Sequence, residues 1–189
     1  GGDVLVTGLA GGASGDVLRA DLAAVGIPES LEPIAAESRR TVSVVSGATG
    51  AATLFNEPGP PVANAEWARF GDRFGRLVAG AQVVVLSGSL PPGIPEDAYA
   101  QLVRIARSAG AATIVDSDGA SLRAALAAGP DVVKPNAAEL VAASGIDDPV
   151  AAVAWLRDQG AAAVVATSGA DGMIAVTPTG SERSCSRAC

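Results

Sequence analysis

The chain has 189 residues, 49% of them hydrophobic, and a formal net charge of −7. A chain of this size and composition suits one folded domain with a sizeable core. The negative charge argues against general nucleic-acid binding, which needs a basic surface. The chain contains no histidine, and this excludes Ser-His-Asp and Cys-His triads as well as histidine metal ligands.

The cysteines and the lengths of the apolar runs indicate where the protein is found. Both cysteines, Cys185 and Cys189, lie together in a polar tail, so the body of the fold does not rest on disulfides. The sequence has no signal-peptide pattern, and no apolar run approaches the roughly 20 residues that span a bilayer. We therefore expect a cytoplasmic protein that contacts neither a membrane nor nucleic acid.

The first half of the chain predicts a strand, a helix, a hairpin and a second helix. The strand is a short apolar run ending in glycine, and the hairpin has Ser, Thr and Gly between two β-like runs. Aromatic residues on one face mark the second helix, where core packing explains them better than a cofactor does. The expected ranges are 3–8 for the strand, 12–26 for the first helix, 41–56 for the hairpin and 66–80 for the second helix.

The second half alternates regularly between apolar strands and helices. Continuously apolar strands are typical of a parallel sheet with helices on both faces, so we predict an α/β fold. The tail at 179–189 has no apolar period and is predicted to be disordered. The expected strands are 82–88, 112–117, 131–135, 162–169 and 172–178, and the expected helices are 96–110, 120–129, 136–145 and 148–160.

Unusual residues gather where the predicted strands end. Ligands of open α/β sheets bind outside the carboxyl ends of the strands. Glycines there let a backbone approach a ligand closely, and helix N-termini offer free N–H groups to an anion. These stretches predict a phosphate pocket, and they are 7–15, 87–93, 116–119, 134–139 and 167–172.

Several of these residues also allow a purely structural interpretation. Asn136 and Glu139 have the spacing of a capping box, and Asp116 could cap the helix that follows it. Arg39 and its neighbour Arg40 could be ordinary solvated charges. Lys134, the only lysine of the chain, is harder to explain structurally, because a charge at the end of an apolar strand is costly without an anionic partner.

The segments LSGSLPPGIP, IVDSDGASLRAAL, VVKPNAAEL and TSGADG, in this order, resemble the PfkB (ribokinase-like) carbohydrate kinases. LFNEPGP together with SGSLPPG resembles the phosphosugar branch, the 1-phosphofructokinase and tagatose-6-phosphate kinase type. The resemblance runs from about residue 4 to residue 178. It implies a ribokinase-like three-layer α/β/α sandwich over 1–178, incomplete, with a small β-lid inserted at about 39–58.

The resemblance also implies roles for individual residues. Lys134 would stabilise the transferring phosphoryl group, and the cofactors would be ATP and Mg²⁺. A homodimer through the lid is also implied. The implied substrate-binding residues are Arg39, Ser87, Gly88, Ser89, Gly11 and Gly12. The implied ATP-binding residues are Lys134, Thr167, Ser168, Gly169, Ala170, Asp171 and Gly172. The implied metal-site residues are Asp116, Asn136 and Glu139.

The sequence departs from the family pattern at both ends. A complete member begins with a strand bearing a substrate-binding Asp and a GGKGxN turn, and its later GAGD motif carries the general base; neither motif occurs here. The implied activity is ATP-dependent phosphorylation of a ketohexose phosphate, namely fructose 1-phosphate, fructose 6-phosphate or tagatose 6-phosphate, to a bisphosphate. The alternatives are a non-catalytic remnant that binds phosphate or nucleotide, and a structural α/β domain whose polar strand ends are caps.

Overall fold

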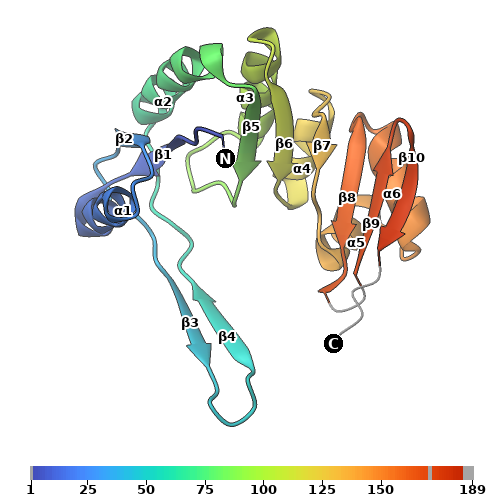
Figure 1. Ribbon diagram of the computed structural model, residues 1–189. Helices are drawn as coiled ribbons and strands as arrows, with labels where there is room; N and C mark the ends of the chain where they lie inside the picture. Colours follow the sequence, from blue (N-terminus) through green and yellow to red (C-terminus); the bar gives the residue numbers. More distant parts are fainter. Residues whose placement is uncertain (1, 170–171, 185–189) are drawn as a thin grey trace. The chain divides into compact units, whose positions relative to one another are not determined.

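The computed structural model describes residues 2–169 and 172–184, without the side chains of 181–184. The chain forms two compact units (Figure 1), one made of residues 1–74 with 91–94 and the other of residues 75–90 with 95–189. Helix α2 (Asn64–Leu77) crosses the boundary between them. Among the described residues, no helix is long and apolar enough to cross a membrane.

The first unit contains two small sheets. Strands β1 and β2 pair in parallel, from Val6 opposite Glu29 to Ala10 opposite Pro33. Strands β3 and β4 form an antiparallel hairpin whose side chains are all exposed, which confirms the hairpin predicted at 41–56. The elements of this unit are β1 (Val6–Ala10), α1 (Gly12–Ala24), β2 (Glu29–Pro33), β3 (Thr41–Val45), β4 (Ala52–Asn56) and most of α2.

Strand β2 has no counterpart among the predicted elements. Its sequence, ESLEP, carries two glutamates and a proline, which are rare in strands. The structure nevertheless buries Glu32, because Arg69 and Arg73 of α2 bind its carboxylate through their Nε atoms at 2.8 and 2.9 Å. The pairing of these charges allows a polar sequence to form a strand with a buried carboxylate.

The second unit is built around a six-stranded sheet with the strand order β10-β9-β8-β7-β6-β5. Strands β5 to β8 are parallel, and β9 and β10 run antiparallel to their neighbours. The predicted alternation of strands and helices is confirmed. The elements are η1 (Val78–Gly80), β5 (Val83–Ser87), α3 (Ala98–Ser108), β6 (Ala112–Asp116), α4 (Gly119–Leu126), β7 (Val132–Val133), α5 (Ala137–Ser144), α6 (Pro149–Asp158), β8 (Ala163–Thr167), β9 (Met173–Thr177) and β10 (Gly180–Ser184).

Helices α3 to α6 all lie on one face of this sheet (Figure 1). Consecutive strands pair side by side, and right-handed crossovers between sequential neighbours place every helix on the same face. Burial follows the strand alternation: Val84 and Leu86 of β5 are buried, while Val83 and Val85 are 53% and 61% exposed. We call the face that carries Val83 and Val85 the open face.

The end of the chain differs from the prediction. Residues 179–189 are expected to be disordered, but Gly180–Ser184 form β10, which pairs antiparallel with β9 from Gly180 opposite Thr177 to Ser184 opposite Met173. The prediction is therefore wrong for these five residues, because backbone pairing with an edge strand needs no apolar period of its own. Residues 185–189 lie outside the described part of the chain.

Candidate functional site

Three predicted site residues of the second unit, Ser87, Asp116 and Lys134, lie on the open face because of the strand register. Ser87 pairs with Asp116 across β5 and β6, and Ile114 pairs with Val132 across β6 and β7. Because side chains two residues apart share a face, Asp116 and Lys134 come to lie side by side at the carboxyl ends of their strands. The lysine Nζ is 3.0 Å from Asp116 Oδ2. The sole lysine thus has the anionic partner that its position requires.

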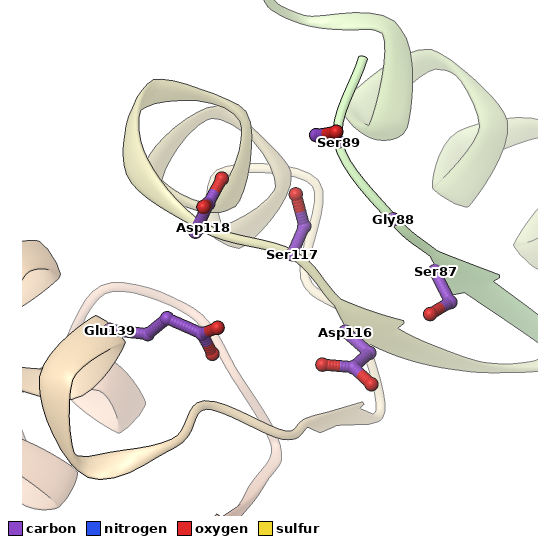
Figure 2. Close-up of a pocket in the computed structure, with 7 residues that line it drawn as sticks. All are labelled: Ser87, Gly88, Ser89, Asp116, Ser117, Asp118 and Glu139. Carbon is purple, nitrogen blue, oxygen red and sulfur yellow. The ribbon is translucent and has the colours of Figure 1, made fainter. Parts of the chain in front are cut away.

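A cavity of about 180 Å³ opens at these strand ends. Figure 2 shows its lining side chains, which come from the turn after β5, the end of β6 with the start of α4, and the first turn of α5. The lining residues are Ser87, Gly88, Ser89, Asp116, Ser117, Asp118 and Glu139. Sequence reasoning missed Ser117 and Asp118. They belong to the predicted strand-end stretch 116–119, in which only Asp116 was assigned a role.

The turn after β5 is held by backbone geometry. Gly88 has φ +103°, a conformation that side chains rarely adopt. Its N–H donates to the Asp116 carbonyl at 3.1 Å, and its own carbonyl accepts a hydrogen bond from the Tyr99 hydroxyl of α3 at 2.7 Å. These bonds fix the turn between β6 and α3, so Ser87 and Ser89 are presented at the cavity wall by a constrained backbone.

Asn136 and Glu139 form the capping box that their spacing allows. The Asn136 side-chain oxygen accepts from the Glu139 amide at 2.9 Å, and the Glu139 carboxylate accepts from the Asn136 amide at 2.9 Å and from its Nδ2 at 2.6 Å. The cap does not exclude a ligand role, because Glu139 also lines the cavity. It fixes the direction of that carboxylate.

The acidic residues suit a magnesium ion only in part. No group of three or more His, Cys, Asp or Glu side chains within the described residues could hold a metal. Magnesium commonly uses one or two carboxylates and completes its shell with water and substrate phosphates. Asp116 and Glu139, both on the cavity wall, fit that pattern, whereas Asn136, whose side-chain oxygen accepts from the Glu139 amide, is not a lining residue.

The predicted nucleotide loop follows β8. The Thr167 amide donates to the Pro135 carbonyl at 3.0 Å, which places the end of β8 beside the segment that leads into α5. The loop closes on itself through a bond of 2.8 Å from the Ser168 amide to the Gly172 carbonyl and one of 3.2 Å from the Gly172 amide to the Gly169 carbonyl. Ala170 and Asp171, also predicted to bind ATP, lie outside the described residues.

Gly11, Gly12 and Arg39 belong to the first unit, where packing constrains both glycines. A Cβ on Gly11 would meet the Ile34 carbonyl, and Gly12, with φ +65°, lies against Glu37. The Glu37 carboxylate accepts hydrogen bonds from the Ser14 hydroxyl and the amides at the start of α1, and these bonds hold its pKa below the usual value. Arg39 is exposed just before β3.

Comparison with known proteins places these observations in a family. Residues 1–188 match the family described as pfkB family carbohydrate kinase. A 1-phosphofructokinase of Rhodobacter capsulatus is 35% identical over 179 residues, which are 92% of this chain and 57% of that protein. The crystal structure of phosphofructokinase-2 from Escherichia coli in complex with fructose-6-phosphate is 31% identical with a TM-score of 0.90, over 100% of this chain and 64% of that one.

A possible 1-phosphofructokinase from Thermotoga maritima gives a similar result, with 26% identity and a TM-score of 0.85 over 94% of this chain and 58% of that one. These solved structures agree with the predicted ribokinase-like α/β fold. The chain spans less than two thirds of the length of each relative.

Proposed function

The chain belongs to the pfkB family of carbohydrate kinases, and we propose that it serves the transfer of the ATP γ-phosphoryl group to a hydroxyl of a ketohexose phosphate. The product would be a bisphosphate, formed in the cytoplasm. The proposed acceptors are fructose 1-phosphate, fructose 6-phosphate and tagatose 6-phosphate. The observation that carries the proposal is the cavity at the strand ends, lined by Ser87, Ser89, Asp116 and Glu139, together with the ion pair between Asp116 and the only lysine.

Lys134 has the central role in this proposal. A point positive charge beside the transferring phosphoryl group would stabilise the charge that spreads over its equatorial oxygens. The ion pair with Asp116 holds the ammonium at the strand end before a ligand arrives. Ser87, Ser89 and the fixed turn around Gly88 would hold the phosphate of the sugar, and the loop from Thr167 to Gly172 would hold the nucleotide.

Asp116 and Glu139 would hold a magnesium ion through water and phosphate oxygens. When bound, the ion neutralises negative charge on the phosphates. The capping box supports this role indirectly, because Asn136 restrains the Glu139 carboxylate with two hydrogen bonds. Asn136 then acts by positioning Glu139 rather than as a ligand itself.

The hairpin of the first unit is the proposed lid. Arg39 precedes it, and its planar guanidinium is suited to bidentate binding of a sugar phosphate. Val42, Val44 and Phe55 share one face of the hairpin by register and are all exposed. We propose a second copy of this chain as the partner that covers them, since a two-stranded ribbon is marginal alone and apolar patches of this kind mark interfaces.

The principal test is a steady-state assay of ADP release with each of the three sugar phosphates across a magnesium series. We expect magnesium-dependent release that requires one of the phosphosugars. Nucleotide binding without turnover would support the second candidate, a non-catalytic phosphate-binding remnant. A chain that binds neither nucleotide nor phosphosugar would refute both.

A substitution at the lid tests the substrate side separately. Arg39→Lys should weaken phosphosugar binding and leave nucleotide binding unchanged, because a point charge does not reproduce the guanidinium fork. Arg40→Lys is the matched control, since its side chain is also exposed beside the hairpin. If Arg39→Lys weakened the binding of phosphosugar and nucleotide equally, the substitution would have disturbed the fold and not a phosphate contact.

A further inference from the structure

Ser117 is a buried polar residue at the cavity without a hydrogen-bond partner. It is 7% exposed, and its hydroxyl oxygen is almost inaccessible and unpaired among the described residues. Buried hydroxyls are nearly always hydrogen-bonded, and leaving one unpaired is unfavourable. Ser117 lines the cavity, and Figure 2 shows its side chain leaving the backbone on the opposite side from the Asp116 side chain, in the same direction as that of Asp118.

The start of helix α4, directly after Ser117, has no side-chain cap. Asp118 occupies the N-cap position with an extended backbone (φ −126°, ψ 176°), which suits capping, yet its carboxylate makes no cap hydrogen bond. The first amides of a helix have no partner within the helix. In the described chain, the amides of residues 119–121 therefore have no side-chain acceptor.

We infer that the Ser117 hydroxyl and the first amides of α4 together bind an oxygen of a phosphoryl group in the ligand. Both are neutral donors, and the helix N-terminus adds a favourable dipole for an anion. Neutral donors matter here because three carboxylates, those of Asp116, Asp118 and Glu139, line the cavity, whereas Lys134 pairs with Asp116 and is not a lining residue. The inference rests on the proposed function for the identity of the ligand class, and it adds a contact that the family resemblance does not supply.

The test compares Ser117→Ala with Ser121→Ala in the full chain. Ser121 lies in the first turn of the same helix but does not line the cavity. The probes are inorganic pyrophosphate, ADP and fructose 6-phosphate, each with magnesium present, and the readouts are the melting temperature without ligand and the Kd by calorimetry. Ser117→Ala should keep or raise the ligand-free melting temperature and weaken the binding of at least one probe about tenfold, whereas Ser121→Ala should change none of the three affinities.

A lower ligand-free melting temperature with unchanged affinities would overturn the inference, since the hydroxyl would then have an internal structural role. Hydrogen exchange on the unsubstituted chain gives a second measurement. Exchange at the amides of residues 119–121 should slow when the affected probe is added, and unchanged exchange, or no binding of any probe, would also overturn the inference. If pyrophosphate binding depends on Ser117 while the chain shows no kinase turnover, the phosphate contact stands and the proposed function fails.

Discussion

Replacing Lys134 by methionine separates the structural contribution of the lysine from its chemical one. The Lys134–Asp116 pair is partly exposed, with 42% and 30% of the side chains accessible. A pair of this kind contributes no more than about 1 kcal/mol to stability. For a chain of this size, that corresponds to a fall in melting temperature of less than about 4 °C. Methionine preserves the apolar stem, and Asp116 can be hydrated once its partner is gone.

The chemical effect should be larger. Removing one group that stabilises charge in phosphoryl transfer should lower turnover by at least about tenfold, equivalent to about 1.4 kcal/mol of transition-state stabilisation. Turnover would be measured by ADP release and stability by thermal unfolding. Arg123→Met, which removes an exposed cation from α4, is the control and should leave both unchanged. Wild-type turnover in Lys134→Met, or a melting temperature lower by more than about 10 °C, would refute the argument.

Three further predictions concern the cap, the buried charge and the open face. Glu139→Gln should change stability by less than about 1 kcal/mol, since Gln also serves a capping box, but should raise the magnesium needed for half-maximal activity. Glu32→Gln should lower the free energy of unfolding by about 1–2 kcal/mol at pH 7 in urea titrations. The hydrogen bond from Arg69 lowers the pKa of Glu32, so this difference should shrink as the pH falls below the model-compound value of 4.5. Val83 and Val85 leave apolar groups of the open face exposed, so we expect the chain to self-associate through this face as well. Replacing both by threonine should reduce that self-association in sedimentation, because threonine removes apolar groups and is also a strand-forming residue.

Each of these has a matched control. Glu96→Gln removes an exposed carboxylate outside the cavity and should not alter the magnesium requirement. Glu29→Gln affects a more exposed ion pair with Arg19, so it should destabilise the chain less than Glu32→Gln does. Val150→Thr alters an exposed valine on α6 and should leave association unchanged. If the loss of unfolding free energy in Glu32→Gln did not depend on pH, packing and not charge would explain that loss.

The sequence predicts the second unit well because its signals are local. Apolar runs, helix periods and glycines fix each strand and helix, and the parallel register then brings Asp116 beside Lys134 without further information. The features that sequence reasoning missed depend on distant partners. Glu32 becomes buried only because α2 supplies two arginines, and β10 forms only because β9 offers an edge.

The candidate site likewise combines residues that local sequence motifs predict with residues whose environment depends on distant parts of the chain. Ser87, Gly88, Ser89, Asp116 and Glu139 were predicted from strand-end motifs and do line one cavity. Gly11 and Gly12 also sit in a strand-end motif; the chain approaches them closely around Ile34 and Glu37, and their ligand role stays a prediction. Ser117 carries no sequence signal of its own, because an unpaired hydroxyl is defined by what surrounds it in three dimensions.

The sequential strand order has a consequence for the time course of folding. Each of the three parallel pairings from β5 to β8 joins strands that follow one another along the chain, across a crossover that contains one or two helices. Pairing across such a crossover loses more chain entropy before contacts form than closing a hairpin does, so these pairings are the slow steps of folding. The sequential strand order nevertheless lets the sheet grow one βα unit at a time from β5. Lys134 reaches Asp116 only when the third strand of that series, β7, is added.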